Sequence, residues 1–162
     1  VAAVAALVYS IERIINIPIL GIFYLPVFAT GIALASADVH LYDPRFRWFF
    51  PVVSWIGFII LAFAYALKET GPPADILADL SLGFFYVGAG MFALKETFCF
   101  RIIGLPLVPF LLCGSILNRL FGYSSAEPYL LLPAALLLTW LCVAKWRMPL
   151  HFDIGDKSLY SL

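Results

Sequence analysis

Residues 91–101 read Met-Phe-Ala-Leu-Lys-Glu-Thr-Phe-Cys-Phe-Arg and separate two long apolar runs. The segment carries four charged or reactive side chains, Lys95, Glu96, Cys99 and Arg101, whereas its flanks are almost entirely apolar. Because charged side chains are costly in hydrocarbon, we expect this stretch to form a turn at a membrane surface. Such a turn decides how often the chain crosses the membrane and which compartment each loop faces.

The composition is that of a polytopic membrane protein. Hydrophobic residues make up 64% of the 162 residues and charged residues only 12%. That charged share is about half of what a soluble domain carries. The apolar segments are too many and too long to be buried in one small soluble core. The net charge is zero and no basic run is present, so nucleic acid is excluded as a partner.

Five apolar segments alternate with polar connections, and we expect each to be a full transmembrane helix. About 20 apolar residues cross roughly 30 Å of hydrocarbon at 1.5 Å per residue. Pro106 and Pro109 are expected to bend the fourth segment or to shift its start. The predicted fold is an all-α transmembrane bundle in residues 1–146, with a partial helix at residues 1–9 and a polar tail at residues 147–162. The predicted spans are residues 17–37, 48–67, 76–94, 102–117 and 130–146.

The third predicted span, residues 76–94, has the features of a helix that packs closely against its neighbours. Asp75 and Asp79 give it an acidic first turn, which suits the positive end of a helix dipole. Its later half is rich in small residues between Gly83 and Gly90. Small side chains of this kind let two membrane helices approach closely.

Basic residues are divided unevenly between the two sets of alternating loops. One set carries seven Lys and Arg residues and the other carries three. Because cytoplasmic loops hold an excess of Lys and Arg, we expect the first set, and with it the C-terminal tail, to face the cytoplasm or the stroma. The first set is Arg45, Arg47, Lys95, Arg101, Lys145, Arg147 and Lys157, and the second is Arg13, Lys68 and Arg119.

The three cysteines, Cys99, Cys113 and Cys142, stand far apart in the sequence. Their spacing indicates neither a disulfide framework nor a zinc site, because no C-x-x-C pair and no histidine-rich tract is present. We expect Cys113 and Cys142 to be buried in helices, where free cysteine behaves as a small hydrophobic side chain.

Three pieces of the chain form a distinctive combination: GIAL at residues 31–34 leading into HLY at 40–42, FALKETFCF at 92–100, and HFDIGDKS at 151–158. From about residue 31 onward the chain resembles a family of integral membrane proteins of cyanobacteria and plastid-bearing eukaryotes. The resemblance implies a location in thylakoids or in the membranes of bacterial relatives, and it implies no reaction. It departs at the N-terminus, and the chain begins within an apolar segment, so we expect a targeting peptide or a further helix upstream.

On the predicted topology the three pieces lie at one membrane face, and two interpretations of their polar side chains stay open. A cluster of His, Glu, Cys and Asp could bind a transition metal, and Glu96 and Cys99 would share one helix face. Alternatively, and more in keeping with the absence of any ligand pair at a known spacing, these groups dock loops and tail through ion pairs such as Glu96 with Arg101 or Lys145. The candidates are His40, Lys95, Glu96, Cys99, Arg101, His151, Asp153 and Asp156.

Pigment binding is a further hypothesis. Bis-histidine haem needs two facing histidines, whereas His40 and His151 both lie in segments at the edge of the bundle. Chlorophyll needs one axial donor, for which His40, His151 and Asn118 are candidates. Because such donors are few, we expect few or no pigments held by side chains. Chlorophyll tails or carotenoids could lie along the surface of a chain with 15 Phe, 8 Tyr and 4 Trp.

The sequence favours a non-catalytic accessory or scaffold subunit of a larger membrane complex. Neither H-E-x-x-H nor G-x-S-x-G is present, so we do not expect an enzyme. The resemblance points to photosystem subunits or antenna proteins as neighbours within the lipid. A small transporter or channel, and a metal- or redox-active membrane protein, are the alternatives. A continuous polar cavity would favour transport, and dry apolar packing would argue against it.

Overall fold

The computed structural model describes residues 1–17, 21–37, 44–67, 72–100, 102–123 and 125–148. These residues form six α-helices and one 3-10 helix, with no β-strand among them, so the all-α prediction is confirmed for the described chain. The elements are α1 (Ala2–Ile15), α2 (Gly21–Ala37), α3 (Pro44–Ala66), α4 (Pro72–Thr97), η2 (Leu105–Leu107), α5 (Val108–Leu120) and α6 (Glu127–Trp146).

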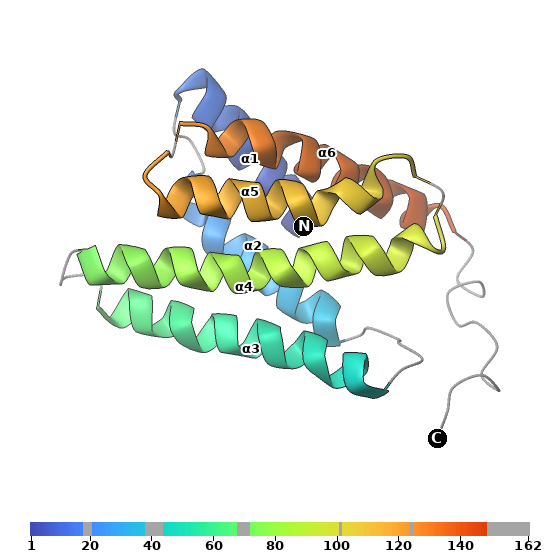
Figure 1. Cartoon of the computed structure of the whole chain (residues 1–162), viewed down its shortest axis with the longest axis horizontal. Helices are drawn as coiled ribbons and strands as arrows, with labels where there is room; N and C mark the ends of the chain where they lie inside the picture. Colours follow the sequence, from blue (N-terminus) through green and yellow to red (C-terminus); the bar gives the residue numbers. More distant parts are fainter. Residues whose placement is uncertain (18–20, 38–43, 68–71, 101, 124, 149–162) are drawn as a thin grey trace.

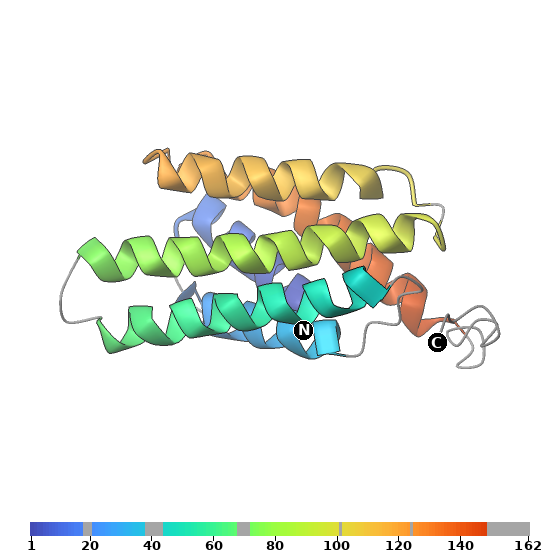
Figure 2. The same ribbon diagram turned by 60° about the horizontal axis from the view of Figure 1, so that its bottom comes forward.

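The helices form a closed circuit in chain order (Figure 1). Each α-helix contacts the next one along the chain, and α6 returns to contact α1. α4 also contacts α2 and α6, which makes it the central helix. α1, α3 and α5 end at one end of the bundle, which we call the arginine end, and α2, α4 and α6 end at the opposite, lysine end (Figures 1 and 2). Among the described basic residues, Arg13 and Arg119 lie near the arginine end, and Arg47, Lys95, Lys145 and Arg147 near the lysine end, in agreement with the two predicted sets.

Three helices are long and apolar enough to cross a membrane: Arg47–Ala66, Ala74–Thr97 and Glu127–Trp146. Two further apolar helices, Phe23–Ala37 and Leu105–Leu120, are shorter. The expectation of five full spans is therefore not supported by the described residues. The physical reason is length, since the 13 residues of α5 rise only about 20 Å, well short of the roughly 30 Å hydrocarbon layer.

The predicted fourth span, residues 102–117, starts too early. Gly104 adopts a left-handed conformation with φ of 95°, and α5 begins only at Val108. Pro106 and Pro109 lie in the first turns of η2 and α5. Proline has no amide hydrogen and is accommodated in a first turn, where no partner for it is needed. The prolines therefore shift the start of the helix, which is one of the two effects expected of them.

Several helices extend beyond their predicted limits into charged residues. α1 continues past Tyr9 to Ile15, where Asn16 ends it with a left-handed φ of 56°. α4 continues to Thr97, and α6 already begins at Glu127. Charged residues in a terminal turn resemble loop residues in a hydropathy pattern, so the predicted helices end too soon.

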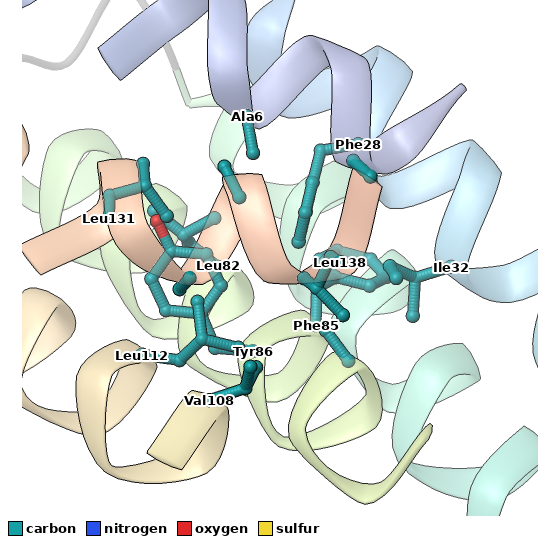
Figure 3. Packing of buried hydrophobic residues seen from close by; sticks show 14 of the residues in the cluster. Ala6, Phe28, Ile32, Leu82, Phe85, Tyr86, Val108, Leu112, Leu131 and Leu138 are labelled. Carbon is teal, nitrogen blue, oxygen red and sulfur yellow. The ribbon is translucent and has the colours of Figure 1, made fainter. Parts of the chain in front are cut away.

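One continuous cluster of apolar side chains fills the interior and includes residues from all six α-helices. Figure 3 shows Phe28 of α2, Phe85 of α4 and Leu131 of α6 within this cluster. All three side chains are fully buried. Because every helix contributes to one core, the bundle is a single packed body.

Glycines on α4 allow close contact with neighbouring helices. A Cβ atom at Gly90 would lie 3.2 Å from the Cβ of Pro109 on α5, and one at Gly83 would lie 3.7 Å from Ile116. Gly88 faces α2 and α3. The small residues that predicted a close helix approach thus pack against helices of this same chain.

Large apolar side chains cover much of the outer surface. Trp48, Phe110 and Trp140 are each at least two-thirds exposed. Cys113 and Cys142 are exposed as well, so the expectation that they are buried is wrong. In a bilayer the tails of the lipids are as apolar as leucine, and an apolar helix face can point outward. Hydrophobicity therefore does not separate interior residues from lipid-facing ones.

We predict that Gly90→Ala destabilises the bundle relative to Gly83→Ala. Both substitutions add the same methyl group and gain the same helix propensity. Only the methyl at position 90 would crowd the Cα and Cβ atoms of Pro109, at 3.3 and 3.2 Å. Overpacking of this kind costs about 1 kcal/mol or more, so thermal unfolding in detergent should occur at a lower temperature for Gly90→Ala. Equal midpoints would mean that α5 moves away from α4 at no cost.

Candidate functional site

The ion pairs between described side chains form two clusters, one at each end of the bundle. Both α4 and α6 contribute to both clusters. The arginine cluster consists of Tyr9, Asp79, Arg119 and Glu127, and the lysine cluster consists of Lys95, Glu96 and Lys145.

The arginine cluster is centred on the Arg119 guanidinium group. Its Nε donates to Asp79 Oδ1, and its Nη1 donates to the Tyr9 hydroxyl at 3.0 Å. The same Nη1 lies 3.4 Å from each carboxylate oxygen of Glu127, whose side chain is only 1% exposed. The Tyr9 hydroxyl donates in turn to Glu127 Oε2 at 3.4 Å. One arginine therefore connects α1, α4, α5 and α6.

Helix geometry explains why these residue types meet. Glu127 is the first residue of α6, where the positive end of the helix dipole stabilises an anion. Arg119 lies in the last turn of α5, where the negative end stabilises a cation. The guanidinium is always charged and offers donors in several directions, so it can serve two carboxylates and a hydroxyl together. The short connection from α5 to α6 brings the two charges side by side.

Tyr9 connects the arginine cluster to two tyrosines in the interior of the bundle. Its ring stacks on that of Tyr24, with centroids 4.2 Å apart and 9° between the ring planes, and the Tyr24 hydroxyl is hydrogen-bonded to that of Tyr86 at 2.8 Å. Burial raises the pKa of the Tyr9 hydroxyl above its ordinary value, and the Glu127 carboxylate raises it further against the opposing effect of Arg119. Tyr9 is therefore neutral at physiological pH and can both accept and donate a hydrogen bond.

The lysine cluster is centred on a buried carboxylate. The Glu96 side chain is 5% exposed, and its Oε1 accepts a hydrogen bond from Lys145 Nζ at 2.9 Å. Lys95 Nζ lies 3.3 Å from the same oxygen. Lys145 is one of the two partners that the sequence suggested for Glu96. Because α4 continues past Leu94, the carboxylate belongs to the last helical turn and not to a loop.

An apolar layer separates the two clusters. Asp79 and Glu96 are about 25 Å apart along α4, and Glu127 and Lys145 are about 27 Å apart along α6. Both separations approach the thickness of the hydrocarbon core of a bilayer. Beyond the Tyr24–Tyr86 pair, most of the buried side chains toward the lysine end are apolar, although Ser36 and Ser54 are buried there too. The apolar ones include Phe28, Ile32, Ala89, Ala93 and Leu138.

Only some of the predicted metal and pigment ligands lie within the described residues. Asn118 Nδ2 donates to the carbonyl of Gly114 within α5 at 2.8 Å. Cys99 is exposed in the turn after α4. No group of three His, Cys, Asp or Glu side chains that could hold a metal ion is found in the described ranges. Metal and pigment binding stay predictions, because His40, His151, Asp153 and Asp156 lie outside those ranges. Arg101, a predicted docking residue, also lies outside them.

The arginine cluster was not predicted from the sequence. Asp79 was assigned to a helix start, Arg119 and Glu127 to a loop, and Tyr9 to a partial helix. A usable signal was present, because an acidic residue such as Asp79 within an apolar segment needs a partner. The sequence did not identify that partner, which lies 40 residues away.

Residues 33–162 match the family described as "Uncharacterized integral membrane protein (DUF2301)". The chain belongs to this family. It is also similar to an "Uncharacterized protein" of Haemophilus influenzae, with 34% identity over 149 residues that cover 90% of this chain and 77% of that protein. No solved structure matches the chain. The family match includes Lys95, Glu96 and Lys145 and every member of the arginine cluster except Tyr9.

The family establishes an integral membrane protein. This agrees with the three helices able to span a bilayer and with the apolar outer surface. The restriction to cyanobacteria and plastids that the resemblance implied is not shown, because the relative comes from Haemophilus, a bacterium without photosynthesis.

We predict that Arg119→Met destabilises the protein strongly, by about 3 kcal/mol. The substitution keeps much of the side-chain volume but leaves the Asp79 and Glu127 carboxylates without their cation. Arg47→Met is the matched control, because Arg47 is exposed near the start of α3. Thermal unfolding in an uncharged detergent measures the difference. Adding Asp79→Asn and Glu127→Gln to Arg119→Met should recover part of the loss. Equal midpoints for Arg119→Met and Arg47→Met would contradict a stabilising role of the arginine cluster.

Proposed function

We propose that this chain is a non-catalytic accessory or scaffold subunit of a larger assembly in the membrane. One observation carries the proposal: ion pairs fasten the helices at both ends of an apolar layer that is tightly packed. A bundle held in this way is a rigid body with lipid-facing sides. Its large exposed aromatic side chains, such as Trp55, Phe110 and Trp140, offer contact area to other membrane helices as well as to lipid.

The state of the buried carboxylates supports a non-catalytic role. Glu96 is engaged by Lys95 and Lys145, and Glu127 by Arg119 and Tyr9. A general base must be free to take a proton from a substrate within hydrogen-bonding reach. Carboxylates held by cations in a buried cluster suit structural anchoring better.

Transport is the second candidate, and the packing argues against it. A solute or ion path needs polar groups along its length, often at broken helices near the middle of the membrane. In the described interior the ion pairs at the two ends are separated by a largely apolar layer between Tyr86 and Glu96, in which Ser36 and Ser54 carry buried hydroxyls but no charge. A channel would require this layer to open.

We do not extend the proposal to a photosystem. That partner rested on the resemblance to proteins of photosynthetic organisms, and a relative in Haemophilus needs a partner that exists without photosynthesis. A membrane assembly common to both kinds of bacteria fits the family better. Chlorophyll and carotenoid are accordingly no part of the proposed core function.

The proposal predicts a stable complex. We expect the chain, extracted from its own membranes in a mild uncharged detergent, to co-migrate with other integral membrane proteins on a native gel. The chain produced in a host that lacks these partners is the control and should migrate faster. Migration of the native chain at the control position would contradict the proposal. Solute uptake by liposomes containing the chain alone would favour transport in its place.

The basic loops predict an orientation of the bundle in the membrane, and a thiol reagent can test it. In a Cys113→Ser, Cys142→Ser background, we expect an impermeant reagent to modify Cys99 from the cytoplasmic side, because Cys99 is exposed at the lysine end. The matched control replaces Cys99 by serine and introduces Tyr123→Cys, an exposed position at the arginine end. This variant should react from the opposite side. Reversed labelling would invert the predicted orientation.

A further inference from the structure

The length of α5 limits the thickness of the membrane beside it. η2 contributes 3 residues and α5 contributes 13, and together they rise about 25 Å. The chain turns at both ends of this unit, where Gly104 and Gly122 adopt left-handed conformations with φ of 95° and 81°. Because the peptide groups of a turn are not all hydrogen-bonded within the chain, they need water and avoid hydrocarbon. The hydrocarbon layer that α5 can cross is therefore no thicker than about 25 Å.

Exposed aromatic side chains on α3 and α6 mark the same thickness. Trp48 and Tyr65 lie near the two ends of α3, and Tyr129 and Trp146 lie near the two ends of α6. All four are at least half exposed. In each helix the two aromatic residues are 17 positions apart, which is a rise of about 25 Å. Tryptophan and tyrosine prefer the two interfaces between hydrocarbon and water, so these side chains indicate where the interfaces lie.

The ion pairs of the central helix agree with these two markers. Asp79 and Glu96, the members of the two clusters on α4, are also 17 positions apart. α3 and α6 do not contact each other, and α4 lies between them (Figure 1), so the agreement extends across the bundle. The apolar height is about 5 Å less than the roughly 30 Å of a typical hydrocarbon core. Any tilt of the helices reduces this height further.

We propose that the outer surface of the bundle is matched to a thin membrane, with lipids of short acyl chains lying against α3, α5 and α6. In a thicker bilayer, the lipids beside α5 must compress or the turns at its ends must enter hydrocarbon. Either response costs free energy that rises with each ångström of mismatch. That cost falls on the folded bundle, so lipid length controls its stability. This property goes beyond the proposed scaffold role and requires no partner protein.

The first test varies only the length of the lipid. The chain is reconstituted in bilayers of dimyristoleoyl-, dioleoyl- or dierucoyl-phosphatidylcholine, which share a headgroup and increase in acyl-chain length in that order. Thermal unfolding is followed by circular dichroism. We expect the highest unfolding temperature in the dimyristoleoyl lipid and a decrease with each increase in length, because the mismatch grows. Equal midpoints in the three bilayers, or the highest midpoint in either longer lipid, would overturn the proposal.

The second test locates the aromatic side chains in the dimyristoleoyl bilayer. A Trp55→Phe/Trp140→Phe variant keeps tryptophan only at positions 48 and 146, and the matched Trp48→Phe/Trp146→Phe variant keeps only Trp55 and Trp140, about 10 Å closer to the middle of the layer. All four side chains are exposed, so both variants should fold. Small amounts of phosphatidylcholine brominated near the glycerol or near the chain end quench tryptophan fluorescence at the corresponding depth.

We expect the shallow bromine to quench Trp48 and Trp146 more strongly, and the deep bromine to quench Trp55 and Trp140 more strongly. Stronger quenching of the first pair by the deep bromine would place the aromatic residues inside the hydrocarbon, and the layer would then be thicker than their spacing. That result would overturn the proposal even if the unfolding temperature varied with lipid length.

Discussion

The pairing of Arg119 with Asp79 and Glu127 is the interaction on which the arrangement of the helices depends most. A buried carboxylate is strongly unfavourable without a cation and hydrogen-bond donors around it. Because Tyr9, Asp79, Arg119 and Glu127 come from four helices, their mutual contacts fix the position of each helix along its axis. A slip of one helical turn moves a residue by 5.4 Å and would separate every pair in the cluster.

The bilayer makes such pairs more important than they would be in water. Lipid tails are as apolar as the core, so burial of apolar side chains gives little preference for one helix arrangement over another. The preference for one helix arrangement comes instead from close packing at glycines such as Gly90 and from ion pairs at the ends of helices. The lysine cluster stabilises the helix arrangement at the opposite end, where Glu96 of α4 pairs with Lys145 of α6. Between the clusters, the side chains of neighbouring helices then need only complementary shapes in order to pack.

The location of the ion pairs at the helix ends, with apolar packing between them, is also the basis of the proposed scaffold role. In the proposed scaffold role, the charged groups at the helix ends hold the helices together, as Arg119 does with Asp79 and Glu127.

The sequence by itself determined the membrane class, the all-α fold and the alternation of loops between two ends, because hydropathy and charge act locally along the chain. It did not determine the length of α5, which follows from where Gly104 and the two nearby prolines allow a helix to start. Only the tertiary structure decided that Cys113 and Cys142 face outward and that Arg119 meets Asp79, 40 residues away, and Tyr9, 110 residues away. Such contacts depend on which helix faces which, and in a bilayer the outside of a helix is as apolar as its inside.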